Sequence, residues 1–297
     1  MLTNAVRLHN ADTLSLDTFS LPEISPDEIL LRVMTDSLCT STYKAVKQGT
    51  AHKRVPDDIA ENPIIIGHEM CGEIVSVGSN LGNEWYVGQQ VIIQPALKQD
   101  NGHDPGYSFP YIGGASTYVV VPKIVLDRGC LLPYSGEGSY KGSLVESIGC
   151  VLRGFKGLYH TDYTDYTRTD GAKEGGHIAI LGGAGPMGLA TTALAVKYAK
   201  ASIVTVIDIN EERLSDVEKR FPPSEAPGCK LSYVNTSGCD NPAKMLKELS
   251  EGGYDDVFVM VPVPSLFTLA EEICRVDGCI NFFAGPSIHN FPGSLNL

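Results

Sequence analysis

Short apolar runs alternate with polar segments along the chain, and their spacing predicts different architectures in its two halves. The most regular stretch starts with the apolar run 178–181, continues through the Ala-rich segment 186–200 and ends in the β-branched run 203–207. This pattern predicts a buried strand, a helix and a second buried strand. Further strands are predicted at 257–261 and 279–284, and helices at 211–221, 242–251 and 266–276. The rhythm is typical of a parallel sheet covered on both faces.

The first half has shorter runs separated by Pro- and Gly-containing turns, which predict a mostly β unit. Residues 95–115 are rich in Gly, Pro and Asp and predict a long loop, and residues 144–159 have helical spacing. The polar segment 161–175 is interpreted as the boundary between the domains, and its Tyr- and Thr-rich run 161–168 as a linker. We therefore expect an α/β chain with domains at 1–160 and 161–297. Strands are expected at 5–8, 28–33, 64–66, 73–77, 88–93 and 115–121.

A glycine motif joins the first strand of the second half to its helix. Gly183, Gly185 and Gly188 have the spacing G-x-G-x-x-G, and Asp208 lies twenty residues further on, at the end of the next strand. These glycines allow a tight turn, close approach of a pyrophosphate and close packing of helix on strand. The helix N-terminus favours the phosphates, and a carboxylate at Asp208 favours NAD over NADP. The motif therefore predicts a dinucleotide site.

Neighbouring residues complete the expected cofactor site. Pro186 and Met187 lie within the glycine turn, and Arg213 follows Asp208 closely. Two alternatives remain open. The turn could belong to a domain that binds nothing, and Asp208 could simply cap the helix expected at 211–221.

Composition limits the function classes. The net charge is −12, which argues against a general nucleic-acid or anionic-membrane surface. The sequence has no apolar run that could span a bilayer, and its start has no signal-peptide core, so we expect a cytoplasmic protein. The eight cysteines form no dense or paired pattern and are expected to be reduced thiols.

Four residues are candidate metal ligands. His68 and Glu69 are adjacent at the end of a predicted strand, Cys39 lies on an earlier loop, and Glu146 lies at the start of the helix expected at 144–159. Cysteine, histidine and glutamate all ligate zinc, and three protein ligands leave a position for water or substrate. The residues alone also allow a structural histidine and a small buried thiol.

The motifs Cys39-x-Ser41, Gly67-His68-Glu69-x-x-Gly72, Leu144-Val145-Glu146 and the GGAGPMG turn occur in one order. In these motifs the chain resembles zinc-dependent medium-chain alcohol/polyol dehydrogenases, particularly the sorbitol dehydrogenase branch. The resemblance implies an N-terminal GroES-like catalytic domain, a Rossmann domain and one catalytic zinc held by Cys39, His68 and Glu146. It also implies that Glu69 is a group beside the metal or an occasional ligand, and that Ser41 relays the alcohol proton.

The segment KQGTAHKRVPDDIAENPIIIGHE and the MVPVP and NFFAGP motifs resemble the L-sorbose-1-phosphate reductase subgroup. This resemblance implies a phosphorylated ketose/polyol pair as substrate, with Lys44, Lys53 and Arg54 as candidate phosphate contacts. Charge alone favours a solvated surface loop for Lys53 and Arg54, and the resemblance makes the two interpretations nearly equal.

The sequence departs from the family pattern in four respects. Residues 95–115 contain no cysteine, so the four-cysteine structural zinc of many relatives cannot form there. Lys44 occupies the position of a relay histidine, and Ser147 the position of a usual proline. The chain also stops before the segments that complete the Rossmann and catalytic domains in relatives, which is expected to expose an edge strand.

Two other functions remain alternatives. One is a non-catalytic NAD-binding regulatory or structural protein of the same fold. The other is a zinc-free quinone-reductase-type relative, against which the Cys39, His68 and Glu146 set argues. The resemblance further implies a homodimer or homotetramer that acts on a small molecule, with no nucleic-acid or membrane partner.

Overall fold

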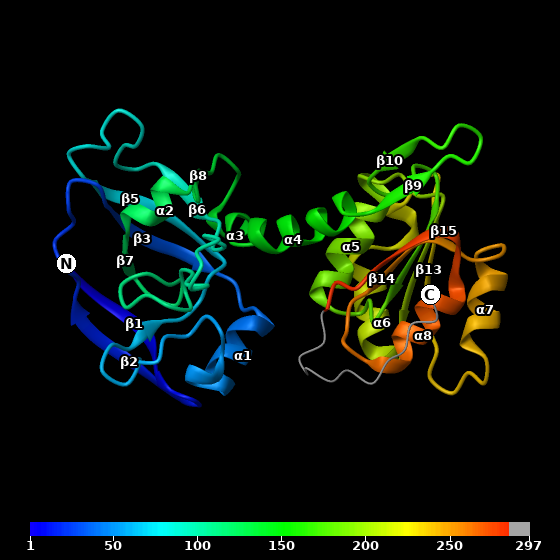
Figure 1. Ribbon diagram of the computed structural model, residues 1–297, viewed down its shortest axis with the longest axis horizontal. Helices are drawn as coiled ribbons and strands as arrows, with labels where there is room; N and C mark the ends of the chain where they lie inside the picture. Colours follow the sequence, from blue (N-terminus) through cyan, green and yellow to red (C-terminus); the bar gives the residue numbers. More distant parts are fainter. Residues whose placement is uncertain (285–297) are drawn as a thin grey trace. The chain divides into compact units, whose positions relative to one another are not determined.

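A computed structural model describes residues 1–284 of the chain; the predicted chain end after Asn290 lies outside this range. The chain divides into two compact units, Met1–Ser147 and Ile148–Leu297. Each unit has its own hydrophobic core, so each is described separately (Figure 1).

The first unit is built mainly from antiparallel strands, as its short apolar runs predict. Within the described residues one sheet has the order β7-β3-β5-β6-β8, and a smaller one the order β2-β1-β4. Inward-facing aliphatic side chains such as Leu31, Ile74 and Val119 are fully buried between them. The strands are β1 (Leu2–Asn10), β2 (Thr13–Ser20), β3 (Ile29–Asp36), β4 (Ile64–Ile65), β5 (Met70–Val77), β6 (Gln90–Ile93), β7 (Tyr118–Val121) and β8 (Leu131–Pro133). The helices are α1 (Thr40–Gln48), η1 (Gly49–Ala51), α2 (Lys123–Asp127) and α3 (Ser139–Gly142).

Strand pairing brings the two metal-binding motifs together. β3 and β5 pair antiparallel with Asp36 opposite Met70, so the end of β3 meets the start of β5. The loop after β3 carries Cys39, and the residues just before β5 are His68 and Glu69. Segments about thirty residues apart in sequence therefore converge at one edge of the sheet.

The second unit contains a parallel sheet with the order β13-β12-β11-β14-β15 within the described residues. Ile178 and Ile180 pack with α5 and α6 on one face, whereas Ala179 and Leu181 pack with α7 and α8 on the other. This confirms the expected doubly covered sheet. Its strands are β9 (Tyr159–Thr161), β10 (Arg168–Asp170), β11 (His177–Leu181), β12 (Ile203–Asp208), β13 (Lys230–Asn235), β14 (Tyr254–Val259) and β15 (Cys274–Asn281). Its helices are α4 (Val145–Lys156), α5 (Pro186–Lys197), α6 (Glu211–Arg220), η2 (Pro223–Glu225), α7 (Pro242–Leu249) and α8 (Pro264–Ile273).

The transition between the units lies within α4, thirteen residues before the sequence-based boundary at 160. Val151 and Phe155 of this helix are fully buried in the core of the second unit, which explains why most of α4 belongs there.

The segment interpreted as a linker contains ordered structure instead. β9 and β10 form an antiparallel hairpin, with His160 paired to Thr169. Gly171 N–H donates to the carbonyl oxygen of Leu158 at 2.7 Å. The linker interpretation of 161–168 was therefore wrong.

Candidate functional site

Cys39, His68 and Glu69 form a compact set of metal-ligating side chains in the first unit. Their sulfur, nitrogen and carboxylate oxygen all lie within 4.8 Å of one another. His68 and Glu69 are buried, and Cys39 is half-buried. A thiolate, an imidazole and a carboxylate match the donor chemistry of catalytic zinc, so the residues present fit the metal that the family resemblance implies.

His68 is oriented for ligation through Nε2. Its Nδ1 lies 3.1 Å from Thr42 Oγ1, and in the tautomer whose Nδ1–H donates to that hydroxyl, Nε2 is the free base. Burial lowers the pKa of His68 to about 4, which keeps the imidazole neutral. A neutral imidazole is the form that binds a metal ion.

The two glutamates differ in their relation to this set. Ser147 Oγ donates to Glu69 Oε1 at 2.9 Å, and Ser37 Oγ donates to Glu69 Oε2. Glu146 does not belong to the set found within 4.8 Å among the described residues, but its charge helps to raise the pKa of Cys39, after burial as the main cause. Both carboxylates therefore lie close enough to act on the Cys39 thiol.

Tyr107 is a site residue that the sequence reasoning missed. Its hydroxyl lies 2.6 Å from Ser41 Oγ and 3.2 Å from His68 Nε2, and its side chain is fully buried. Ser41 Oγ in turn lies 3.0 Å from Cys39 Sγ. Ser41 thus lies among the thiol, the imidazole and the phenol, and burial raises the pKa of Tyr107 to about 12, so the phenol stays protonated.

A close backbone contact at Gly106 places Tyr107 beside His68. Gly106 has φ +76, and a Cβ at this position would lie 2.0 Å from the carbonyl oxygen of Gly67. The glycine allows the 95–115 loop to pass directly against the turn that precedes His68. A Pro-Gly-Tyr sequence in a polar loop gives no signal of this contact.

The three predicted phosphate contacts, Lys44, Lys53 and Arg54, lie near His52, and Tyr107 lies between His52 and His68. Burial lowers the pKa of His52, and the charges of Arg54, Lys53 and Lys44 lower it further. His52 stacks on Tyr107 with ring centroids 5.9 Å apart. The guanidinium of Arg54 lies 4.8 Å from the centre of the same ring, and its Nε contacts Asp104 Oδ2 at 3.2 Å.

The glycine turn in the second unit has the geometry that its spacing predicts. A Cβ at Gly188 would lie 2.0 Å from Gly183 O, which shows how closely α5 packs on the turn. Gly185 is the N-cap of α5, with Pro186 at the first helical position, and no heavy atom lies within 4 Å of a Cβ placed there. Open space at a helix N-terminus suits a phosphate group.

Asp208 lies at the end of β12 beside this turn. Its Oδ2 accepts from Ala184 N–H at 3.1 Å, and its Oδ1 accepts from Ile209 N–H at 2.8 Å. The side chain of Asn210, not Asp208, caps α6 by accepting from Arg213 N–H at 3.0 Å. The helix-cap alternative for Asp208 is therefore wrong, and the side chain of Arg213 is exposed at the first turn of α6.

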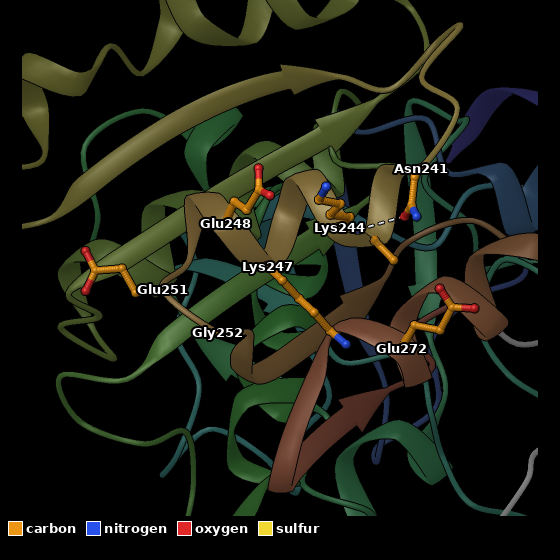
Figure 2. Close-up of a pocket in the computed structure, with 8 residues that line it drawn as sticks. Asn241, Lys244, Lys247, Glu248, Glu251, Gly252 and Glu272 are labelled. Carbon is orange, nitrogen blue, oxygen red and sulfur yellow. Dashed lines mark hydrogen bonds between the residues drawn. The ribbon is translucent and has the colours of Figure 1, made fainter.

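A surface hollow on the second unit contains none of the predicted site residues. Figure 2 shows its lining, which includes the basic residues Lys244 and Lys247 and the acidic residues Glu248 and Glu251. Asn241 caps α7 there by accepting from Lys244 N–H at 2.9 Å. Because this hollow is open and combines basic with acidic side chains, we assign it no ligand or reaction.

Comparisons with known proteins show which proteins the chain is similar to. The sequence profile of the alcohol dehydrogenase GroES-like domain matches residues 25–127. L-sorbose 1-phosphate reductase of Klebsiella pneumoniae is 44% identical over 302 residues, which cover 99% of this chain and 72% of the relative. Mannitol-1-phosphate 5-dehydrogenase of Aliivibrio fischeri is 42% identical over 299 residues, covering 99% and 71%. The crystal structure of 2R,3R-butanediol dehydrogenase from Bacillus subtilis superimposes with a TM-score of 0.75 at 22% identity, covering 97% of this chain and 80% of that one.

The chain belongs to the family of zinc-dependent medium-chain dehydrogenases. It is an NAD(P)-dependent enzyme of the alcohol/polyol dehydrogenase class. No helix in residues 1–284 is both long and apolar enough to cross a membrane.

Proposed function

We propose that the protein interconverts a ketose phosphate and a polyol phosphate by hydride exchange with NAD(H), in the manner of L-sorbose 1-phosphate and glucitol 6-phosphate. The observation that carries this proposal is the placement of Lys44, Lys53 and Arg54 around His52, which stacks on Tyr107. The two relatives described above also carry names that refer to phosphorylated polyols or ketoses.

The metal part of the proposal assigns one catalytic zinc to Cys39 and His68, with Glu146 as the third ligand and Glu69 beside the metal. A bound zinc supplies Lewis acidity toward the substrate oxygen, and the nicotinamide donates or accepts the hydride. The cluster supports Glu69 as an alternative ligand, because its oxygen already lies within 4.8 Å of the other two ligand atoms.

Ser41 is the proposed proton carrier. Its hydroxyl lies 3.0 Å from Cys39 Sγ and 2.6 Å from the Tyr107 hydroxyl, so it can pass a proton between the substrate oxygen and a buried hydrogen-bonded chain. Lys44 replaces the usual histidine on the same helix. Tyr107 and Thr42 fix the positions of Ser41 and His68, respectively.

The phosphate contacts can be tested by comparing phosphorylated and unphosphorylated substrates. Arg54→Ala is expected to lower kcat/KM for a ketose phosphate by about ten- to a hundredfold, because a charge-assisted hydrogen bond contributes roughly 1.5–3 kcal/mol. Activity on the free ketose should fall much less. The measurement is the ratio of kcat/KM for the two substrates.

Arg54 also pairs with the buried Asp104, so a general loss of stability must be separated from loss of phosphate binding. Lys53→Ala offers a second test because Lys53 is exposed. Lys47→Ala is the matched control, since Lys47 contacts Asp12 at 2.8 Å on the surface. Equal losses on both substrates in Arg54→Ala and Lys53→Ala would contradict phosphate recognition.

The proposed preference for NAD depends on Asp208. Asp208→Ser is expected to weaken NAD binding by roughly tenfold and to improve NADP binding, because a carboxylate accepts ribose hydroxyls but repels a 2′-phosphate. Fluorescence titration with NADH and NADPH measures both affinities. Glu211→Gln is the control, since Glu211 accepts from Asn235 on the surface nearby. An unchanged affinity ratio in Asp208→Ser would remove Asp208 from the site.

Assembly into a homodimer or homotetramer, implied by the family resemblance, belongs to the same proposal. Light scattering after size-exclusion chromatography measures it directly.

A further inference from the structure

A second set of metal-ligating side chains lies in the second unit. His160, Asp256 and Cys279 place a nitrogen, a carboxylate oxygen and a sulfur within 4.8 Å of one another. The residues come from β9, β14 and β15 respectively. None of them belongs to the predicted zinc or dinucleotide site, and Cys279 was interpreted from sequence only as a structural or surface thiol.

Strand register explains why these residues meet. Asp256 and Cys279 are direct partners in the parallel pair β14–β15, so their side chains project from the same face of the sheet. The β9–β10 hairpin crosses this face: Thr161 N–H donates to Asp277 Oδ2 at 2.9 Å, and Cys279 Sγ lies 2.8 Å from the carbonyl oxygen of Tyr159. The hairpin thereby holds His160 over the Asp256–Cys279 pair.

The site lies level with the start of β11, away from the dinucleotide turn: Asp256 pairs with Ile178, the second residue of β11. The hairpin immediately precedes β11, which begins at His177, whereas the glycine turn follows the end of β11 at Leu181. Figure 1 shows β9 and β10 at one end of the second unit. A ligand bound at His160 is therefore separate from the cofactor.

Asp256 has His160 as its ionisable partner. Its side chain is completely buried; Oδ1 lies 3.0 Å from His160 Nε2, and Oδ2 accepts from Lys173 N–H at 3.1 Å. The nearby cationic groups of Lys173 and Arg275 contact Asp255 instead, at 2.7 and 2.9 Å.

We propose that His160 Nε2, Asp256 Oδ1 and Cys279 Sγ bind a divalent cation of the zinc class as a structural site. Tetrahedral zinc bonds of about 2.0–2.3 Å separate ligand atoms by roughly 3.3–3.8 Å, so small side-chain movements complete the site. Water takes the fourth position. Binding releases the thiol proton of Cys279 to solvent, and Tyr159 N–H, 3.5 Å from the sulfur, remains to donate to the thiolate.

The bound cation would link β9, β14 and β15 through one ligand from each strand. The hairpin has only three residues in each strand, and its tip residues Tyr163 and Tyr166 are exposed, so little hydrophobic burial holds it. A metal bond from His160 to the adjacent strands β14 and β15 compensates for this small contact. With this ion the chain would bind two zinc ions, the expected catalytic one and the proposed structural one.

Cobalt substitution tests the site apart from catalysis. The 297-residue chain carrying Cys39→Ala and His68→Ala removes the first cluster, and titration with Co²⁺ then reports any remaining thiolate site through its sulfur-to-cobalt absorption band. We expect about one Co²⁺ per chain with this band. Adding Cys279→Ser or His160→Ala should abolish it.

Cys274→Ser is the matched control, because Cys274 is half-buried on the same strand and close enough for Cys279 to affect its pKa. The band should persist in this variant. The proposal is overturned if the band is absent from the starting background, survives Cys279→Ser, or disappears only with Cys274→Ser.

Zinc content of the unmutated chain provides a measurement that needs no variant to fold. Elemental analysis should give about two zinc ions per chain after gel filtration in zinc-free buffer, and added zinc should raise the melting temperature of the Cys39→Ala, His68→Ala chain. A single zinc ion in the unmutated chain, or no zinc-dependent melting shift in the double variant, would contradict the second site. Neither result depends on which substrate the enzyme uses.

Discussion

Replacing Cys39 or His68 by alanine is expected to abolish turnover while NAD binding remains intact. Each side chain offers one of the ligand atoms clustered within 4.8 Å in the first unit, whereas the glycine turn belongs to the second. Lewis-acid stabilisation contributes several kcal/mol to such reactions, so kcat should fall by at least about a thousandfold. Steady-state kinetics, zinc analysis and NADH fluorescence titration measure the three quantities.

Cys229→Ser is a suitable control, since Cys229 is a half-buried thiol packed against the core of the second unit. It should retain turnover. Loss of NAD binding in a folded His68→Ala protein would contradict the division of roles between the two units. Unchanged turnover in both alanine variants would reject the metal site itself.

Gly188→Ala is expected to lower both the stability of the second unit and its affinity for the dinucleotide. The added Cβ would lie 2.0 Å from the carbonyl oxygen of Gly183, and a backbone oxygen cannot rotate away. The start of α5 must therefore shift from the turn that it forms with β11. Overpacking of this kind costs about 1–3 kcal/mol, which thermal or urea unfolding would measure.

Gly185→Ala separates stability from binding at the same turn. No heavy atom lies within 4 Å of a Cβ placed at Gly185, and its φ of −109 is accessible to alanine. Stability should therefore stay unchanged, while NADH affinity should fall because the methyl group occupies the approach of the pyrophosphate. Equal stability in Gly188→Ala and the unmutated chain would show that the close packing at Gly188 is relaxed at little cost.

The dinucleotide site in the second unit could be predicted from sequence because its motif residues lie close together in the chain. Strand, glycine turn, helix and acidic residue occur within the 32 residues from His177 to Asp208, and each has a backbone requirement visible in the residue type. The helix predicted at 186–200 is α5 (Pro186–Lys197), and Asp208 lies at the end of β12. Short-range geometry thus determines both motif and structure.

The metal half was only partly predictable because its residues come from distant segments. The family resemblance predicted Cys39, His68 and Glu146 as the zinc ligands and Glu69 as a group beside the metal. In the structure it is Glu69 whose ligand atom lies within 4.8 Å of those of Cys39 and His68. Tyr107 was missed, because its contact with Ser41 joins segments 66 residues apart through a loop without periodicity. Such convergence depends on tertiary packing.

Two sequence-based predictions, the linker at 161–168 and the end of the helix at 276, were wrong for the same physical reason. The segment 161–168 was interpreted as a linker since its polar side chains remain exposed even when β9 and β10 pair. The helix expected to run to Val276 ends at Ile273, and β15 begins at once, with no glycine or proline between them. In both cases, partly exposed edge strands lack the buried alternation that identifies strands in sequence.

Asp104 organises the loop in which many relatives build a four-cysteine zinc site. Its Oδ1 accepts from Leu97 N–H at 2.8 Å, its Oδ2 contacts Arg54 at 3.2 Å, and its own N–H donates to Ser108 Oγ at 2.9 Å. A carboxylate that is only 6% exposed thus replaces an ion as the centre of this loop. We therefore expect the loop that carries Tyr107 to keep its structure when a chelator removes zinc from the proposed catalytic site.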